Sequence, residues 1–148
     1  MALADGNEVN AMAELQRTAI TSDQAPQPLG AYSVGMSVNC GKLIYVAGQV
    51  GVDLSGALVG PGDAVAQTRQ VFRNIGGVLE SAGAGFDNVV EFTTYVVGRE
   101  SVQGFIDGRN QIFPDIFPDG DYPPNTLLVV SGLVREEFLV EIKAVAVL

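Results

Sequence analysis

The order of apolar and polar residues along the chain predicts an alternation of strands and helices. Short apolar runs bounded by turn residues predict strands at 18–24, 34–38, 43–50, 89–97, 126–130 and 138–147. Two longer stretches repeat their apolar residues at spacings of three and four, which is the spacing of one helical face. The resulting order is strands, helix, strand, helix and strands, which is typical of an α+β domain.

The first predicted helix has clear end signals. Asp63 is a good N-cap, and Gly83 is a typical residue just beyond a helix end. Its apolar stripe consists of Val65, Thr68, Phe72, Ile75, Leu79 and Ala82. Gly76 and Gly77 weaken the interior of this helix, and they would let its backbone lie close to a sheet.

The second predicted helix begins at Ser101, a residue that caps helices well, and carries apolar residues up to Phe113. Pro114 and Pro118 should end it, because proline removes a helical hydrogen bond.

A turn signal joins two of the predicted strands. Asn39-Cys40-Gly41-Lys42 separates 34–38 from 43–50, so these two strands should form a hairpin. Residues 53–62 are glycine-rich and predict a loop, with a short extended piece at 57–59.

Apolar residues lie on both faces of the predicted strands. In the strand 89–97, Val90, Phe92, Thr94 and Val96 share one face, and Glu91, Thr93, Tyr95 and Val97 share the other. Two helices of this length can cover one face of a sheet. The other face needs a cover, and self-association is the simplest one.

Composition limits the function classes. The 148 residues predict one domain at 17–148, preceded by an extension at 1–16. No window reaches about 18 apolar residues, so no membrane span is expected.

The net charge of −9 disfavours nucleic-acid binding. Histidine is absent, which excludes histidine catalysis and histidine metal sites. One cysteine and an N-terminus without signal-peptide features predict the cytoplasm.

Glu141 is the main candidate for chemistry, because it lies inside the apolar run 139–147. One interpretation is that Glu141 and Lys143 share a solvated face and pair with each other. The other is a general acid/base whose pKa is raised by a half-apolar pocket. Periodicity alone leaves both open.

Three further residues are ambiguous on sequence alone. Tyr32 either anchors its Pro/Gly loop or contacts a ligand. Asn125 and Thr126 lie where a proline-rich loop becomes a strand, which suits both a pocket and a plain turn. Cys40 has one basic neighbour, Lys42, and is expected to be an inert thiol. An anion site at 60–62 is disfavoured by Asp63.

Taken together, these segments resemble the RidA/YjgF family of reactive-intermediate deaminases. The resemblance rests on ordered blocks across residues 17–148: Ala25-Pro26 with Gly30-Ala31-Tyr32-Ser33, Tyr45-Val46-Ala47-Gly48-Gln49-Val50, Gln67-Thr68 with Phe72-Arg73-Asn74-Ile75, Val89-Val90 with Thr93 and Tyr95, and Pro124-Asn125-Thr126 with Val140-Glu141-Ile142.

The resemblance implies a chorismate-mutase-like fold and a homotrimer, with the sheets packed into a barrel and small-molecule clefts between subunits. It also implies hydrolysis of reactive enamines and imines to ketones and ammonia without a metal or cofactor. Tyr32, Gly48, Thr126 and Glu141 occupy matching places, whereas Asn125 replaces the arginine that clamps the substrate carboxylate. We therefore expect Glu141 to be catalytic and Tyr32, Gly48, Asn125 and Thr126 to bind substrate.

Asn125 also favours a neutral or weakly anionic substrate. Three rival functions stay open at this point. The lost arginine supports a non-catalytic trimer that binds a small metabolite in the same cleft. RNA cleavage is ascribed to some family members, but the charge and the absence of histidine argue against it. Chorismate mutase chemistry would need cationic contacts to a dianion, and none can be assigned.

Overall fold

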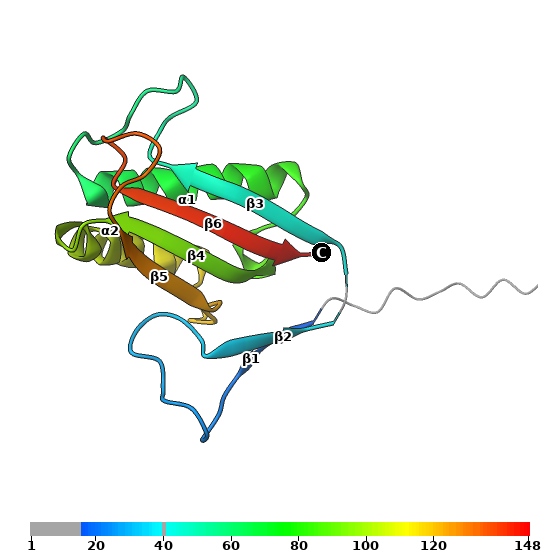
Figure 1. Ribbon diagram of the computed structural model, residues 1–148. Helices are drawn as coiled ribbons and strands as arrows, with labels where there is room; N and C mark the ends of the chain where they lie inside the picture. The colour runs from blue at the N-terminus through cyan, green and yellow to red at the C-terminus, as the bar shows by residue number, and fades with distance from the viewer. Residues whose placement is uncertain (1–15, 40) are drawn as a thin grey trace, which may run out of the picture.

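A computed structural model of the chain describes residues 16–39 and 41–148 as a large body and a small separate hairpin (Figure 1). The elements in chain order are β1 (Arg17–Ile20), β2 (Gly35–Val38), β3 (Leu43–Val50), α1 (Ala64–Ser81), a 3-10 turn (Phe86–Asn88), β4 (Val89–Val97), α2 (Glu100–Ile116), β5 (Asn125–Val130) and β6 (Val140–Val147).

The body is a two-layer arrangement of one sheet and two helices. The sheet has the order β3-β6-β4-β5, in which β4 and β5 are parallel and the other neighbours are antiparallel. Both helices lie on the same face of this sheet (Figure 1). The predicted α+β class, with a mixed sheet and two helices on one face, is therefore confirmed.

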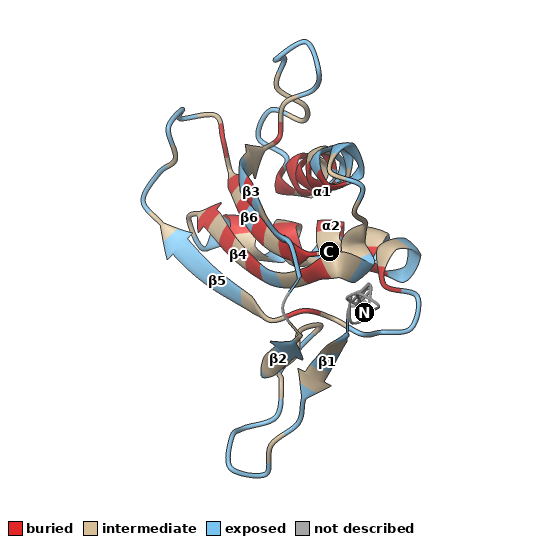
Figure 2. Ribbon diagram, turned by 90° about the vertical axis from the view of Figure 1, so that its right-hand side faces the viewer, coloured by how far each residue is buried: buried red, intermediate tan, exposed pale blue. Residues whose placement is uncertain are grey.

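An aromatic cluster fills the space between the helices and the sheet. Phe72 on α1 lies at its centre, with its ring 5.5 Å from Phe113, 5.7 Å from Phe92 and 6.3 Å from Phe86. The contacts with Phe113 and Phe92 are edge-to-face, and such contacts add to the stabilisation from area burial. Figure 2 shows the buried residues concentrated between the two layers.

Helix α1 begins as the sequence predicts. The Asp63 carboxylate accepts hydrogen bonds from the backbone N–H of Val65 (2.9 Å) and of Ala66 (3.0 Å). The expectation that two glycines bring α1 close to the sheet is wrong. A Cβ at Gly76 would meet the ring of Phe86 at 3.1 Å, and one at Gly77 would meet nothing within 4 Å.

Helix α2 differs from its prediction at both ends. Its N-cap is Arg99, which makes no side-chain capping bond, and Ser101 lies buried inside the first turn. Pro114 lies within the helix, which continues to Ile116. Phe113 and Phe117 are both buried in the aromatic cluster on either side of this proline, and their packing offsets the lost hydrogen bond.

A β-bulge changes which residue of β4 enters the core. The β4–β6 ladder pairs Val89 with Ala146 and Glu91 with Val145, so Val90 is an extra residue. Consequently Val89 is fully buried and Val90 is half-buried, whereas alternation alone placed Val90 on the helix face.

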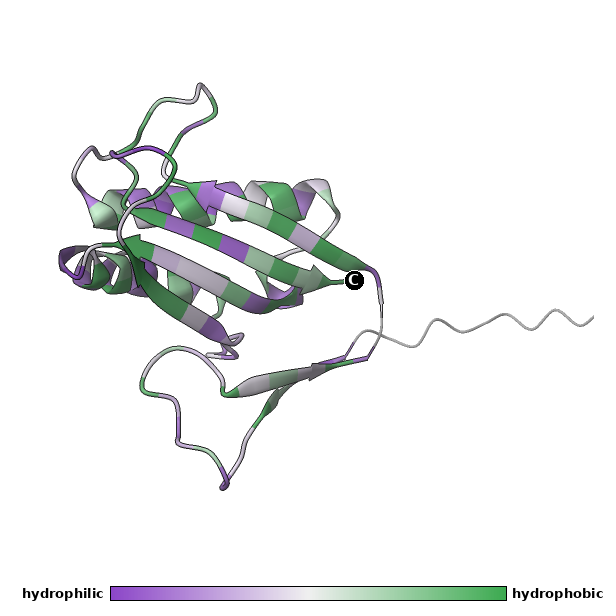
Figure 3. Ribbon diagram, in the orientation of Figure 1, coloured by the Kyte–Doolittle hydropathy of each residue, from purple (hydrophilic) through white to green (hydrophobic). Residues whose placement is uncertain are grey.

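No helix formed by the described residues lies on the second face of the sheet (Figure 1). Figure 3 shows apolar residues, interrupted by polar ones, along all four strands of the sheet. Tyr45 on β3 is 75% exposed and Leu128 on β5 is 39% exposed. An exposed apolar sheet face is what the sequence predicts for a chain that associates with copies of itself.

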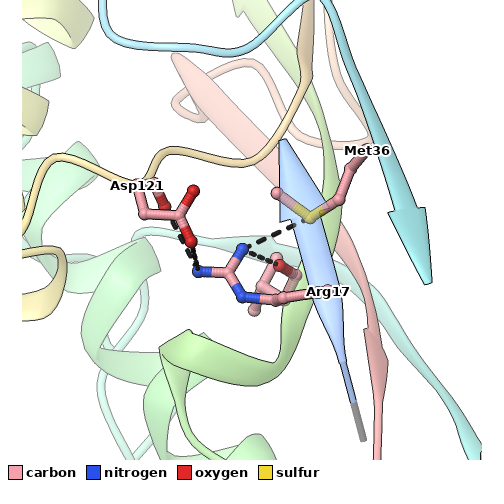
Figure 4. Close-up of polar contacts among 4 residues, drawn as sticks. Arg17, Met36 and Asp121 are labelled. Atoms are coloured by element: carbon pink, nitrogen blue, oxygen red, sulfur yellow. Dashed lines mark hydrogen bonds and ion pairs between the residues drawn. The ribbon is translucent and has the colours of Figure 1, made fainter. Parts of the chain in front are cut away.

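The N-terminal hairpin is the largest departure from the sequence prediction. The predicted pairing of 34–38 with 43–50 is wrong for this chain, because β2 pairs with β1 and β3 pairs with β6. The hairpin is joined to the body through Arg17. Its guanidinium donates to the carbonyl of Val89 (3.0 Å), forms an ion pair with Asp121 (3.0 Å) and contacts the Met36 sulfur (3.3 Å; Figure 4).

Two predictions fall largely outside the described residues. The expected extension covers 1–16, of which only Gln16 is described, and the expected inert thiol is Cys40.

Candidate functional site

Glu141 lies near the start of β6 and on the open face of the sheet. It is opposite Tyr95 on β4 and opposite Val50 on β3. The residue is half-buried, and no hydrogen bond or ion pair to its carboxylate forms among the described residues. A carboxylate held this way against apolar neighbours can exchange a proton with a ligand that reaches it.

Gly48 leaves free the space that the Glu141 side chain occupies. A Cβ atom at Gly48 would lie 2.8 Å from the carboxyl carbon of Glu141 and 3.0 Å from its Cγ. The β3–β6 ladder is irregular between Val46 and Gln49, which is where Gly48 falls. The carboxylate therefore lies directly over backbone that only glycine leaves free.

Lys143 follows Glu141 on the same face, as the sequence predicts. The ion pairs in the described part of the chain are Arg17 with Asp121 and Arg135 with Glu137. The simple interpretation in which Glu141 and Lys143 neutralise each other is therefore not what the structure shows.

Asn125 and Thr126 point to opposite sides of β5. The Asn125 side-chain oxygen accepts a 2.8 Å hydrogen bond from the hydroxyl of Thr94, which is buried on the helix side of the sheet. Thr126 is exposed and lies opposite Thr93, on the open side. Asn125 therefore lies on the other face of the sheet from Glu141.

The sequence leaves open whether Arg69, Arg99 or Arg109 replaces the missing arginine, and the structure places Arg109, on α2, beside Asn125. Arg109 and Asn125 line the same tight crevice, together with Thr94, Ala31 and Pro123. The Arg109 guanidinium lies over the rings of Phe105 (5.7 Å) and Phe113 (5.5 Å) and donates to the side-chain oxygen of Asn110 (3.1 Å).

Arg109 has no carboxylate partner among the described residues. Burial lowers the pKa of its guanidinium from the ordinary value, and the neighbouring Tyr122 opposes this shift in part. A half-buried arginine that lacks a counter-ion is suited to bind an anion from outside the chain.

Tyr32 lies in the loop of the N-terminal hairpin. Its phenol oxygen accepts a 3.0 Å hydrogen bond from the backbone N–H of Leu29, so the side chain anchors its own loop. The adjacent Ala31 lines the crevice with Asn125 and Arg109. The loop that carries Tyr32 therefore lies beside the crevice of Asn125 and Arg109.

The candidates thus form two groups within one chain. Gly48 and Glu141 lie together on the open face of the sheet. Asn125 and Arg109 lie together on the helix side, beside the loop of Tyr32. A single chain does not bring the two groups into one pocket.

Among the described residues, no helix is both long and apolar enough to cross a membrane. Within the same residues there is also no group of three or more His, Cys, Asp or Glu that could hold a metal ion.

Comparisons with known proteins agree with this architecture. Residues 22–148 match the family model described as Endoribonuclease L-PSP. A crystal structure of the Rid family protein YyfB from Yersinia pestis superposes with a TM-score of 0.80 at 32% identity, covering 89% of this chain and 98% of that one. The chain belongs to the RidA/YjgF family.

The curated members of the RidA/YjgF family include named deaminases. The chain is 35% identical to the 2-iminobutanoate/2-iminopropanoate deaminase of Mus musculus over 136 residues, which are 92% of this chain and 95% of the mouse protein. Protein DfrA of Myxococcus xanthus is also 35% identical, over 92% of this chain and 99% of that protein. The YjgF structure from Escherichia coli is 27% identical and superposes with a TM-score of 0.64, covering 88% of this chain and 98% of that one.

Proposed function

We propose that the protein is a deaminase that hydrolyses a small imine or enamine to a ketone and ammonia. The observation that carries this proposal is the half-buried carboxylate of Glu141, which lies over Gly48 and has no hydrogen-bond or ion-pair partner among the described residues. Membership of a family whose members include 2-imino acid deaminases supports this activity.

In the proposed mechanism, Glu141 accepts a proton from water as the water oxygen bonds to the imine carbon. The resulting carbinolamine carries the new hydroxyl and the former imine nitrogen. Glu141 then returns the proton to that nitrogen, and the C–N bond of the protonated amine breaks. As the C=O bond forms, Glu141 accepts the hydroxyl proton and passes it to the departing ammonia, which leaves as ammonium. This use of one carboxylate as base and then acid needs no histidine.

The other candidates would hold the substrate. Asn125 and the backbone N–H of Thr126 would donate hydrogen bonds to it, and Tyr32 would pack against it. Arg109 lines the same crevice as Asn125 and has no carboxylate partner within residues 16–39 and 41–148, so we assign it the negative end of the substrate. An anionic 2-imino acid then fits the site even though Asn125 carries no charge.

The proposed assembly is a homotrimer in the cytoplasm, in which the open faces of three sheets pack against one another. In this assembly the Glu141 group of one subunit meets the Asn125 group of its neighbour. The division of the candidates between opposite sides of one chain supports such a shared site.

The decisive experiment follows 2-iminobutanoate, generated in situ by a threonine dehydratase. We expect the protein to accelerate its decay and Glu141→Gln to lower the acceleration by at least about a hundredfold. Glu91→Gln is the matched control, since Glu91 is an exposed carboxylate on the same face. Equal activity of Glu141→Gln and the unmutated protein would exclude Glu141 as the catalytic group.

The same assay separates the second candidate function, a trimer that binds a metabolite without turnover. Asn125 in the arginine's place favours this alternative. Binding of 2-oxobutanoate without any acceleration of imine decay would support it. RNA cleavage, which the family description names, is opposed by the net charge of −9.

A further inference from the structure

We propose that β2 of one chain adds to the free edge of β3 in a neighbouring chain. This strand addition would bring Tyr32 of the first chain to Gly48 and Glu141 of the second. The inference concerns how the assembly is built, and its test does not depend on the proposed activity.

The first observation is the open edge of β3. One edge of β3 pairs with β6, and among the described residues no strand pairs with the other. Its side chains are also uncovered, with Tyr45 75% and Leu43 54% exposed. A long apolar edge of this kind is a template for another strand, and proteins rarely leave one bare.

The second observation is the matching edge of the hairpin. The strand β2 pairs with β1 on one side and, in the described part of the chain, with nothing on the other. Arg17 on β1 ties that strand to the body. Apolar residues of β2 and its approach, Val34 and Val38, are exposed.

The third observation is a hollow of about 750 Å³ beside the end of β3. It lies between the loop after β3 and the outer side of α1, and its lining includes Gln49, Leu54, Gly77 and Val78. Leu54 and Val78 are exposed, and Gly77 has open space above it. Adding a strand to β3 would extend the sheet beside this region and cover part of the apolar lining.

The occupant that fits best is the hairpin of a second copy. The turn signal at 39–42 predicts that 34–38 pairs with 43–50, whereas in this chain the two strands lie apart. Exchange of an element between identical chains keeps a favoured pairing and moves it between subunits. Each chain then donates its β2 edge to one neighbour and receives the β2 edge of another neighbour at its own β3. Such head-to-tail contacts form a closed ring when the rotation between neighbouring chains adds up to a full turn.

The exchange also explains the divided site. In the register that the turn predicts, Val38 lies opposite Leu43. Continuing this antiparallel register across the irregularity of β3 between Val46 and Gln49 places Tyr32 opposite Gln49 and Val50, and Val50 is itself the partner of Glu141. That position is adjacent to Gly48, over which the Glu141 carboxylate lies. The Tyr32 loop of the first chain lies beside the Asn125 and Arg109 crevice of that same chain. The exchange therefore brings both the loop and this crevice towards Glu141 of the second chain.

The test is a cysteine cross-link between chains, in a background with Cys40→Ser. One chain carries Val38→Cys and a differently tagged chain carries Leu43→Cys, and the two are co-expressed and mildly oxidised. We expect a covalent pair that contains both tags as the main product. A chain with Val38→Cys co-expressed with one carrying Leu128→Cys is the matched control, since Leu128 is also an exposed leucine and lies on the opposite edge strand, β5.

A double variant with both Val38→Cys and Leu43→Cys in one chain supplies the opposing outcome. If β2 folds back onto its own β3, this variant forms a disulfide within the chain and the mixed chains form none above the control level. That result would overturn the proposal. Elution volume and far-UV circular dichroism equal to those of the unmutated protein confirm that each variant folds.

Discussion

The body and the N-terminal hairpin are held by different forces. The body, from β3 to β6, has a continuous apolar core in which an aromatic cluster links both helices to the sheet. The hairpin has no comparable core, and its tie to the body centres on the guanidinium of Arg17. Packing fixes the partners of the body's strands, whereas the hairpin has a free edge whose partner another chain can supply.

The largest expected effect is in the core of the body. Phe72→Ala removes the ring at the centre of the aromatic cluster, which should lower the free energy of unfolding by about 3–5 kcal/mol. Urea denaturation measures this. Leu29→Ala in the hairpin loop, where the side chain is 96% exposed, should change it by less than about 0.5 kcal/mol. Comparable losses in both variants would show that the hairpin belongs to the same cooperative core.

A substitution under Glu141 should affect function more than stability. Gly48→Ala places a Cβ where the Glu141 carboxyl group lies, so the side chain must move. Misplacement by about 1 Å can cost about a hundredfold in rate, and we expect a loss of that order in imine hydrolysis. The control is Gly77→Ala, which meets no atom and should stabilise α1 by up to about 1 kcal/mol. Full activity of Gly48→Ala would contradict the placement of Glu141.

Arg17 tests the attachment of the hairpin. Arg17→Ala removes the bond to the Val89 carbonyl and the ion pair with Asp121, which together should hold the hairpin by about 1–3 kcal/mol. Amide hydrogen exchange should accelerate in peptides covering 17–38 and stay unchanged in β6. Arg135→Ala, which removes a more exposed ion pair, is the control. Unchanged exchange in the hairpin would mean that other contacts hold it.

The smallest effect concerns the loop after β3. The Ser55 hydroxyl, and then the backbone N–H groups of Ala57 and Ser55, lower the pKa of Asp53 below its ordinary value of 3.8. The contribution of these hydrogen bonds to the order of the loop is therefore present above pH 3.8, and it is lost as the pH falls through the lowered pKa of Asp53. Carboxyl NMR titration should show Ser55→Ala moving the pKa of Asp53 upward, and no movement would exclude the hydroxyl as the main cause.

Sequence predicted the body well because its signals are local. Asp63 caps α1 as expected, and the strand predicted at 89–97 has the observed limits of β4. Packing changed the details, since the aromatic cluster carries α2 past Pro114 and a bulge buries Val89 instead of Val90. Local pattern did not determine the partner of β2, because strand pairing is decided by distant residues and by other chains.

The candidate site was predictable only where its signal lies in the local sequence. The apolar run around Glu141 marks an unusual carboxylate, and the structure places Gly48 beneath it. The sequence did not distinguish Arg109 from Arg69 and Arg99 as a replacement for the missing arginine, because an arginine in an amphipathic helix has the pattern of a solvated residue. Only the fold brings it into the crevice of Asn125, over two aromatic rings.

The central claim is that each active site combines Glu141 of one subunit with Arg109 and Asn125 of another. Mixing Glu141→Gln chains with Arg109→Ala chains before assembly tests it directly, with 2-iminobutanoate decay as the readout. In a randomly mixed ring, about a quarter of the sites would receive both intact residues, so activity should recover to about a quarter of the unmutated level. Activity that stays at the mean of the two variants would contradict the claim.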